Sequence, residues 1–344
     1  MDDDWGRRIA QVQAELVRGG DPVAWVTEAD AVEGAMRYRG LAVRGALFGV
    51  AAREVGGAGP WRLVVPVRAG MPQESRDGLQ SLLFFRAKDD TDDPAVRREL
   101  IAAVRVLERE PVDEIDVLGM RYRVVRADEF ARSGTDGSLE PPRPTDPEPV
   151  FRVWEGRSAV SDPDVDVVLD PDRSRGPMAE AMRFGLRSFH YGAERYPAAV
   201  RADSERAVRT HPDIALLPVR FGVVERTGET WEPHDSLLPT PHEARRSLYE
   251  DMIRVWPLVH RWSARECEPY RRAAELFRAA GRADVARVRG REFRIFRAER
   301  MVRFGPDGPE GPRPSDVDEY GPQKLHPTMD EDGTLRQSDD PAAT

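Results

Sequence analysis

Two similar stretches recur in the sequence at matching separation, and this repeat constrains the fold more than any other feature. Residues 119–134, GMRYRVVRADEFARSG, align without a gap with residues 290–305, GREFRIFRAERMVRFG. Residues 41–61 align, in the same order along the chain, with residues 214–231. The interval between the two aligned blocks is nearly the same in both copies. We therefore predict one ancestral unit that is present twice.

Each unit has the pattern of a mixed α+β fold. A run rich in valine, leucine and phenylalanine predicts a strand, and apolar residues at helical spacing then predict two helices. In the second unit the first helix opens at Thr240–Glu243, a capping-box pattern, and Pro257 interrupts it. Short apolar runs on either side of Gly119 and of Gly290 predict a β-hairpin, since glycine adopts the positive φ of a tight turn. We expect α+β architecture built from two tandem strand–helix–helix–hairpin repeats.

The composition changes outside the repeats. The predicted boundaries are an amphipathic N-terminal helix at 1–20, repeat 1 at 21–149, an acidic connector rich in proline and aspartate with a helix at 150–200, repeat 2 at 201–320, and a disordered acidic tail at 321–344. The formal net charge of −9 belongs largely to the connector and the tail, whereas repeat 2 is basic. We expect the tail to fold back on repeat 2.

Several function classes lack their sequence signature. No apolar run reaches the roughly 20 residues of a membrane-spanning helix, and the acidic start MDDDWGRRI is unlike a signal peptide. The single cysteine, Cys267, can form no internal disulfide and has no nucleophile motif around it. The phosphate-binding, GxSxG and HExxH patterns are missing. We expect a cytoplasmic protein that uses no cofactor and no metal and does not act at a membrane.

Several strings resemble an uncharacterised family of actinobacterial proteins with a domain of unknown function. They include DPVAWVTEADAV, MPQE, RYRVVRADEFAR and PPRPTDPEP, followed by DVVLDPD and VRADSERAVRTHP, and the resemblance extends from about residue 21 to 320. The chain has no asparagine, and Lys88 and Lys324 are its only lysines, which is typical of a GC-rich genome. The resemblance implies no activity, ligand or catalytic residue.

The preferred functional hypothesis is a non-catalytic protein that binds another protein or a small ligand between the two repeats. Duplicated units often pair as a homodimer does, and ligands bind in the crevice between them. The candidate ligand-binding residues are the two aligned tryptophans and the aromatic and basic residues of the hairpins, namely Trp61, Trp231, Tyr122, Phe293, Arg123 and Arg294.

One alternative is a hydrolase-type enzyme with its site in repeat 2. His234 and Asp235 align with the apolar Val64 and Val65, and Glu243 follows nearby. His234 can act as a general base that one of the two carboxylates orients. The competing interpretation assigns Glu243 to the helix cap and the other two residues to an ordinary loop.

A second alternative is binding of single-stranded nucleic acid by the hairpin of repeat 2. Arginines and phenylalanines alternate there, and the candidate contacts are Arg287, Arg289, Arg291 and Arg294. The competing interpretation is a solvated strand face whose arginines pair with acidic residues of the same chain.

Overall fold

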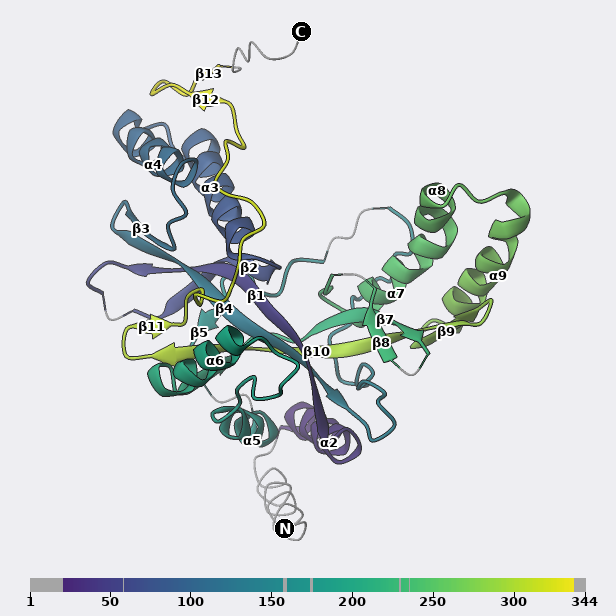
Figure 1. Cartoon of the computed structure of the whole chain (residues 1–344). Helices are drawn as coiled ribbons and strands as arrows, with labels where there is room; N and C mark the ends of the chain where they lie inside the picture. The colour runs from purple at the N-terminus through teal and green to yellow at the C-terminus, as the bar shows by residue number, and fades with distance from the viewer. Residues whose placement is uncertain are drawn as a thin grey trace.

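The structure is a computed structural model that describes residues 21–57, 59–156, 160–173, 176–228, 230–234 and 236–336. The helix predicted for residues 1–20 lies outside these ranges. Within them the chain is a mixed α+β fold, in which helices pack on one large antiparallel sheet (Figure 1). No helix in these ranges is long and apolar enough to cross a membrane.

The sheet has the strand order β5-β2-β1-β4-β10-β7-β8, and the short strands β3, β6, β9 and β11 pair with its two central strands. The strands are β1 (Gly40–Glu54), β2 (Trp61–Ala69), β3 (Glu114–Val117), β4 (Met120–Ser133), β5 (Val168–Leu169), β6 (Asp213–Leu216), β7 (Arg220–Thr227), β8 (Thr230–Pro233), β9 (Val285–Val288), β10 (Arg291–Gly305) and β11 (Gly308–Pro309).

The central strands β4 and β10 are the two stretches that align in the sequence. They pair antiparallel through residues 127–130 and 299–302, with Glu129 opposite Arg300. Each strand is the second arm of a hairpin, and the turn residues have positive φ at Leu118–Gly119 and at Arg289–Gly290. Positive φ at both turn residues is the geometry of a two-residue hairpin, so both predicted hairpins are present.

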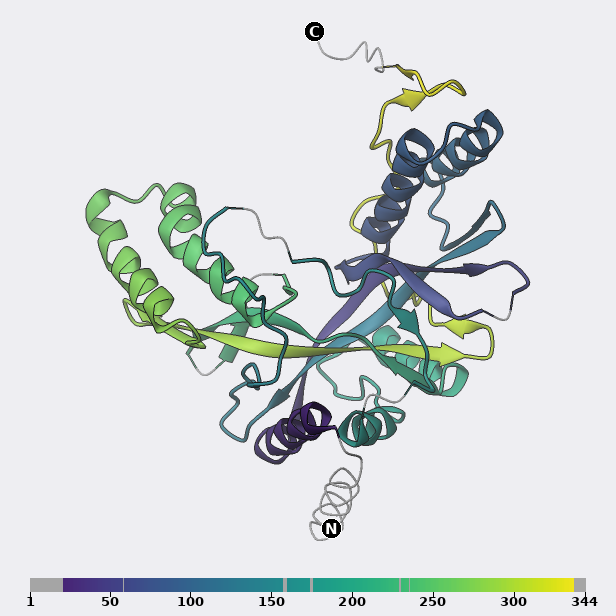
Figure 2. The ribbon, with the colours of Figure 1, turned by 180° about the vertical axis from the view of Figure 1, so that it is seen from behind.

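Two layers of helices stand over opposite ends of β10 (Figure 2). The first layer is α3 (Pro72–Asp89) and α4 (Pro94–Leu107), and the second is α7 (Pro241–Glu250), the π-helix η1 (Asp251–Val255), α8 (Trp256–Val259) and α9 (Ala264–Ala280). Each layer buries its apolar side chains against its own half of the sheet. Two hydrophobic cores therefore flank the central strand pair.

The helix predicted from Thr240 changes form before Pro257. The Thr240 side chain accepts a hydrogen bond from the N–H of Glu243 at 3.2 Å, as a helix cap requires. The Glu243 carboxylate binds Arg246 at 2.7 Å, so the expected reciprocal bond of a capping box is not among the contacts of Glu243. The chain widens into η1 just ahead of the proline, which has no N–H to continue the helical ladder.

Three further helices lie near the centre of the sheet: α2 (Pro22–Arg37), α5 (Pro177–Leu186) and α6 (Ala198–Thr210). Between them run the proline-rich segments that follow β4 and β10. Glu140 accepts a backbone hydrogen bond from Arg297 at 2.8 Å, and Glu310 accepts one from Arg126 at 2.9 Å. Each segment therefore crosses to the central strand of the other half.

The prediction of a disordered tail is wrong for residues 321–336, because these residues pack on the first half. Met329 is buried in the same core cluster as the apolar residues of α4, and the His326 ring stacks on Phe84 with centroids 4.3 Å apart. The Arg97 guanidinium donates to the carbonyl of Glu331 at 2.9 Å. The segment docks on α3 and α4 and not, as expected, on repeat 2. The segment has few other apolar residues, and Met329 together with the hydrogen bonds of neighbouring residues holds it in place.

Candidate functional site

The two sides of β10 have different environments in the second half of the chain. Phe293 and Ile295 point into the core beneath α7 and α9. Successive strand residues point to opposite sides of a sheet, so Phe296 points away from those helices. On that other side Phe296 meets Val224 of β7 and Ala131 of β4 in a smaller apolar cluster.

A cavity of about 480 Å³ lies over this cluster. Both halves of the chain line it: β7, β8 and β10 form one wall, and the ends of β1 and β4 with the loop after β4 form the other. The lining residues are Ala42, Val43, Arg44, Glu129, Ala131, Gly137, Leu139, Val224, Thr230, Trp231, Pro233 and Phe296. We call it the seam cavity. Its size is in the range of small-molecule sites.

Trp231 forms one wall of the seam cavity and is held by arginines. The Arg294 guanidinium lies 4.5 Å from the ring centroid, and that of Arg226 lies 5.9 Å away. Glu292 accepts a hydrogen bond from Arg294 at 2.8 Å, which holds this arginine in place. Cation–π contacts of this kind stabilise an aromatic ring in one orientation. Trp231 therefore presents a positioned aromatic surface to the cavity.

Glu129 supplies a buried carboxylate to the otherwise mainly apolar lining. It is 2% exposed, and burial raises its pKa against the lowering effect of Arg44. The Arg44 guanidinium lies 3.4 Å from the Glu129 carboxylate and is 39% exposed. A carboxylate with one distant, partly exposed partner can accept a further hydrogen bond from a ligand. The cavity thus combines an apolar wall with a charged pair, Glu129 and Arg44, at one side.

In the aligned region of the first half the same tryptophan is buried in a packed core. Trp61 lies between Arg53 at 4.5 Å and Arg123 at 4.9 Å, which align with Arg226 and Arg294. Trp61 is nevertheless only 3% exposed.

Larger apolar residues fill the first half. Leu217 and Val302 pack in its core, where the lining of the seam cavity has the aligned Arg44 and Ala131. Strand β5 also covers the first half, with Leu169 paired to Trp61, whereas β8 ends the sheet on the other side. The seam cavity therefore lies where small or polar residues replace a packed core.

A family model described as a family of unknown function, DUF5954, matches residues 21–319. The chain belongs to the DUF5954 family. No curated protein and no solved structure matches it. The sequence resemblance to a family of unknown function is thereby confirmed, and the family supplies no activity, ligand or site residue.

The other candidate ligand-binding residues of this DUF5954 chain lie away from the seam cavity. Tyr122 and Phe293 are buried under the two helix layers, because they occupy the alternate positions of β4 and β10. Arg123 contacts Trp61 in the packed first half. Trp231 lines the cavity, and Arg294 supports it from the adjacent strand. Trp61 lines no part of the cavity, since Leu217 and Phe304 close its surroundings.

Of the candidate catalytic residues, His234 lies beside a carboxylate that was not among those predicted, that of Asp251. His234 Nε2 lies 3.4 Å from Asp251 Oδ2, and its ring packs edge-on against Trp256. Glu243 pairs with Arg246, and Asp235 lies outside the described residues. Sequence reasoning missed Asp251, which aligns with the apolar Leu82 as His234 aligns with Val64. If the alignment of the two copies is extended through α7 to Asp251, both members of the His234–Asp251 pair stand opposite apolar residues, and this signal could have revealed the pair.

The arginines of the second hairpin are paired largely within their own sheet. Arg291 forms a bidentate contact with Glu225 at 2.6 and 2.7 Å, which raises its pKa. Glu292 binds both Arg287 and Arg294, and Arg289 lies in the turn. Pairing of this kind reduces the positive charge that the hairpin offers to a phosphate backbone.

Cys267 is buried at 4% exposure, and its Sγ lies 3.9 Å from the Trp262 carbonyl oxygen. Among the described residues, no group of three or more histidines, cysteines, aspartates or glutamates is arranged to hold a metal ion.

Proposed function

We propose that the chain is an internally duplicated, non-catalytic binding protein whose seam cavity takes a small and largely apolar ligand. The units of the duplication are repeat 1 at 21–149 and repeat 2 at 201–320. Scarce lysine and missing asparagine support an actinobacterial source. A single cysteine, which can form no internal disulfide, supports a cytoplasmic location.

Matching contacts in the two halves support the duplication. The N–H of Val124 donates to the Asp113 carbonyl, and the aligned Ile295 donates to Asp284 at the same length of 2.8–2.9 Å. The side chain of Arg126 pairs with Asp316, as that of the aligned Arg297 pairs with Asp146; both contacts follow the same crossing of the proline-rich segments. The central pairing places Glu129 opposite Arg300, which align with each other. A pseudo-twofold axis through this pair accounts for these contacts together.

The observation that carries the binding proposal is the difference between the two sides of this axis. The region around Trp61 is closely packed, whereas the region around Trp231 has a cavity of about 480 Å³. Arg44, Gly137, Thr230 and Pro233 of its lining are exposed, so the cavity opens to solvent. A ligand that fills it gains binding free energy from the apolar surface it covers.

The lining indicates the chemistry of the ligand. Trp231, Phe296 and Leu139 favour a flat or branched apolar body. Glu129 and Arg44 favour one polar group, placed where the body of the ligand meets β4. We propose a small molecule of this kind, because the cavity is lined by both halves and offers apolar contacts on several sides.

The test is a titration with anilinonaphthalene sulfonate, an apolar fluorophore with one charged group. The full chain should bind it with a saturable rise in fluorescence. The Ala131→Leu variant places a larger side chain in the cavity and should weaken binding at least tenfold. The matched control is Ala95→Leu, the same change at an exposed position of α4, which should bind as the parent does. Equal binding by Ala131→Leu and the parent contradicts the proposal.

A further inference from the structure

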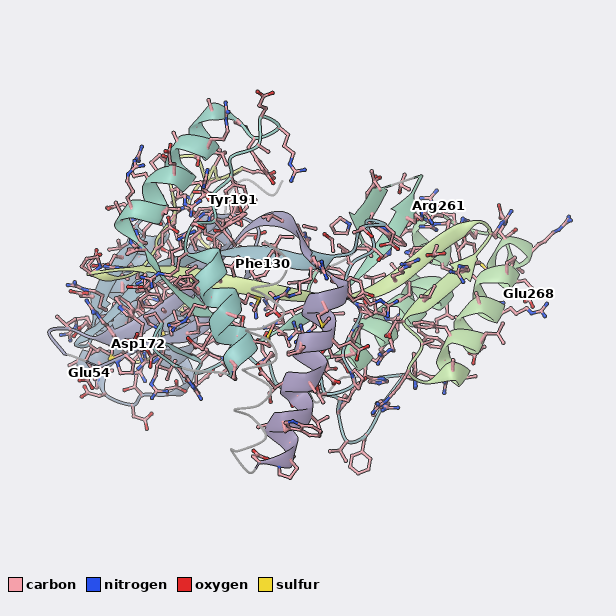
Figure 3. The ribbon with its side chains drawn as sticks, turned by 90° about the horizontal axis from the view of Figure 1, so that it is seen from below. Glu54, Phe130, Asp172, Tyr191, Arg261 and Glu268 are labelled. Atoms are coloured by element: carbon pink, nitrogen blue, oxygen red, sulfur yellow. The ribbon has the colours of Figure 1, made fainter. Side chains whose placement is uncertain are left out.

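A second cavity lies on the other side of β4, where α2 and α5 lie side by side below the central strands (Figure 3). It encloses about 190 Å³, and no residue lines both cavities. Ala131 faces the seam cavity and Arg132 faces this one, because neighbouring strand residues point to opposite sides. The charged lining residues are Arg132, Arg143, Arg297, Glu28 and Glu299. We call it the polar cavity.

Arg132 is the donor in the polar cavity that lacks a partner. Its Nε atom is buried and has no hydrogen-bond acceptor among the described residues. The other two arginines have acceptors: Arg143 Nε donates to Glu140 at 2.7 Å and Arg297 Nε donates to Asp146 at 3.1 Å. Burial lowers the pKa of Arg132. A buried donor without an acceptor is destabilising, and a ligand oxygen that accepts from it would offset this cost.

The residue aligned with Arg132 shows how such a guanidinium is satisfied. Arg303 is 1% exposed and donates to the backbone carbonyls of residues 186, 187, 189 and 211. The same chain segment places the Tyr191 hydroxyl 2.6 Å from the Asp128 carboxylate, to which it donates. Asp128 aligns with Glu299. Around Arg303 and Asp128, therefore, neutral carbonyl oxygens accept from the arginine and a hydroxyl donates to the carboxylate.

The charges around the polar cavity favour a neutral ligand. Its three arginines face four carboxylates, those of Glu28, Glu140, Asp146 and Glu299. Burial raises the pKa of Glu28 and of Asp146, against the lowering effect of the nearby arginines. An anion would add to this excess, and the acceptors of Arg303 are uncharged as well.

From this geometry we infer that the polar cavity binds a small neutral polyol, whose hydroxyl groups accept from Arg132 and donate to Glu299. A hydroxyl group can do both, since it has one donor hydrogen and two acceptor lone pairs. Met178 and Met182 of α5 line the same cavity and offer an adaptable apolar surface to the carbon chain of the polyol. This inference does not depend on the ligand of the seam cavity.

The test uses ribitol as the probe and saturation-transfer difference NMR on the full chain as the readout. Ribitol should bind. Pentanol has the same number of carbons but a single hydroxyl, and ribonate replaces one alcohol by a carboxylate; both should bind at least tenfold more weakly. Absence of ribitol binding, or equal or tighter binding of pentanol or ribonate, overturns the inference.

Variants locate the bound ribitol. Arg132→Gln should weaken binding at least tenfold, and Arg109→Gln, a matched change at an exposed position of the first half, should not. Ala179→Leu fills the polar cavity without removing a charge and should also abolish binding, so it decides the question if Arg132→Gln does not fold. Ala131→Leu alters only the seam cavity and should leave ribitol binding unchanged. Binding that survives both Arg132→Gln and Ala179→Leu refutes the inference.

Discussion

A variant of Asp164 gives the sharpest test of the contacts that hold the segment before β5 against β2 and β10. Its carboxylate is 0% exposed and accepts two hydrogen bonds from Arg300, both at 2.7 Å. It also accepts from the N–H of Val67 at 3.1 Å and lies 3.1 Å from the Arg220 guanidinium. Asp164→Ala would leave two buried arginines without their shared anion. Breaking a buried pair by removing one partner costs about 3–5 kcal/mol.

The assay is equilibrium unfolding in urea, with the midpoint and slope fitted together. The control is Glu331→Ala, which removes an ion pair with Arg98 whose side chains are 61% and 62% exposed, and which should cost less than about 1 kcal/mol. A loss below about 1 kcal/mol for Asp164→Ala would refute the reasoning. A total stability of about 5–15 kcal/mol makes the expected loss a large fraction of the whole.

The same carboxylate predicts a pH dependence. Burial acts to raise the pKa of Asp164, but its hydrogen bonds and charge contacts with Arg300 and Arg220 outweigh burial and lower it. A carboxyl whose folded pKa is depressed contributes stability above its unfolded pKa, and that stability is lost as the pH falls through the folded value. The difference in unfolding free energy between the parent and Asp164→Ala should therefore shrink below about pH 4. A difference that stays constant into strong acid would contradict this.

Two further predictions concern packing that the sequence did not reveal. Tyr191→Phe removes a hydroxyl that donates to the buried Asp128 carboxylate at 2.6 Å, and it should lower the unfolding free energy by about 1.5–3 kcal/mol. The control is Tyr320→Phe, which removes a hydroxyl that donates to the Asp77 carboxylate near the surface at 3.0 Å and should change the unfolding free energy much less. Equal losses in the two variants would show that burial is not the cause. Met329→Ala should lower the unfolding free energy by about 2–5 kcal/mol, because the side chain is 2% exposed and packs in the same core cluster as α4. An unchanged thermal midpoint would mean that the tail does not dock there.

The hairpins and the helices of the two cores could be predicted because local signals determine them. Gly119 and Gly290 mark the turns, and apolar spacing marks α4 and the helix from Thr240. The helix α2 was not predicted, because several of its large apolar residues are exposed and do not mark its buried face. Val23 is 74% exposed and Trp25 is 46% exposed, while the buried positions include Glu28 and Gly34. No amphipathic pattern of large apolar residues reveals such a helix.

The candidate site was predictable only in part, since the deciding contacts join distant segments. Trp61 and Trp231 are equivalent in the sequence, and each lies between two arginines. What separates them is Val302 and Leu217 on one side against Ala131 and Arg44 on the other. Each of these residues is far along the chain from the tryptophan whose surroundings it forms, so only the sheet pairing places it there.

Ala131 offers the most direct test of the account, because it faces the seam cavity at the position where the packed half has Val302. The measurement is the unfolding free energy of Ala131→Leu in the absence of ligand. If the space is as the structure describes it, the added side chain is buried without clash and raises stability by about 1–2 kcal/mol, since each buried CH₂ contributes up to about 0.8 kcal/mol. A loss of about 1–3 kcal/mol, the usual result of overpacking a filled core, would contradict the account.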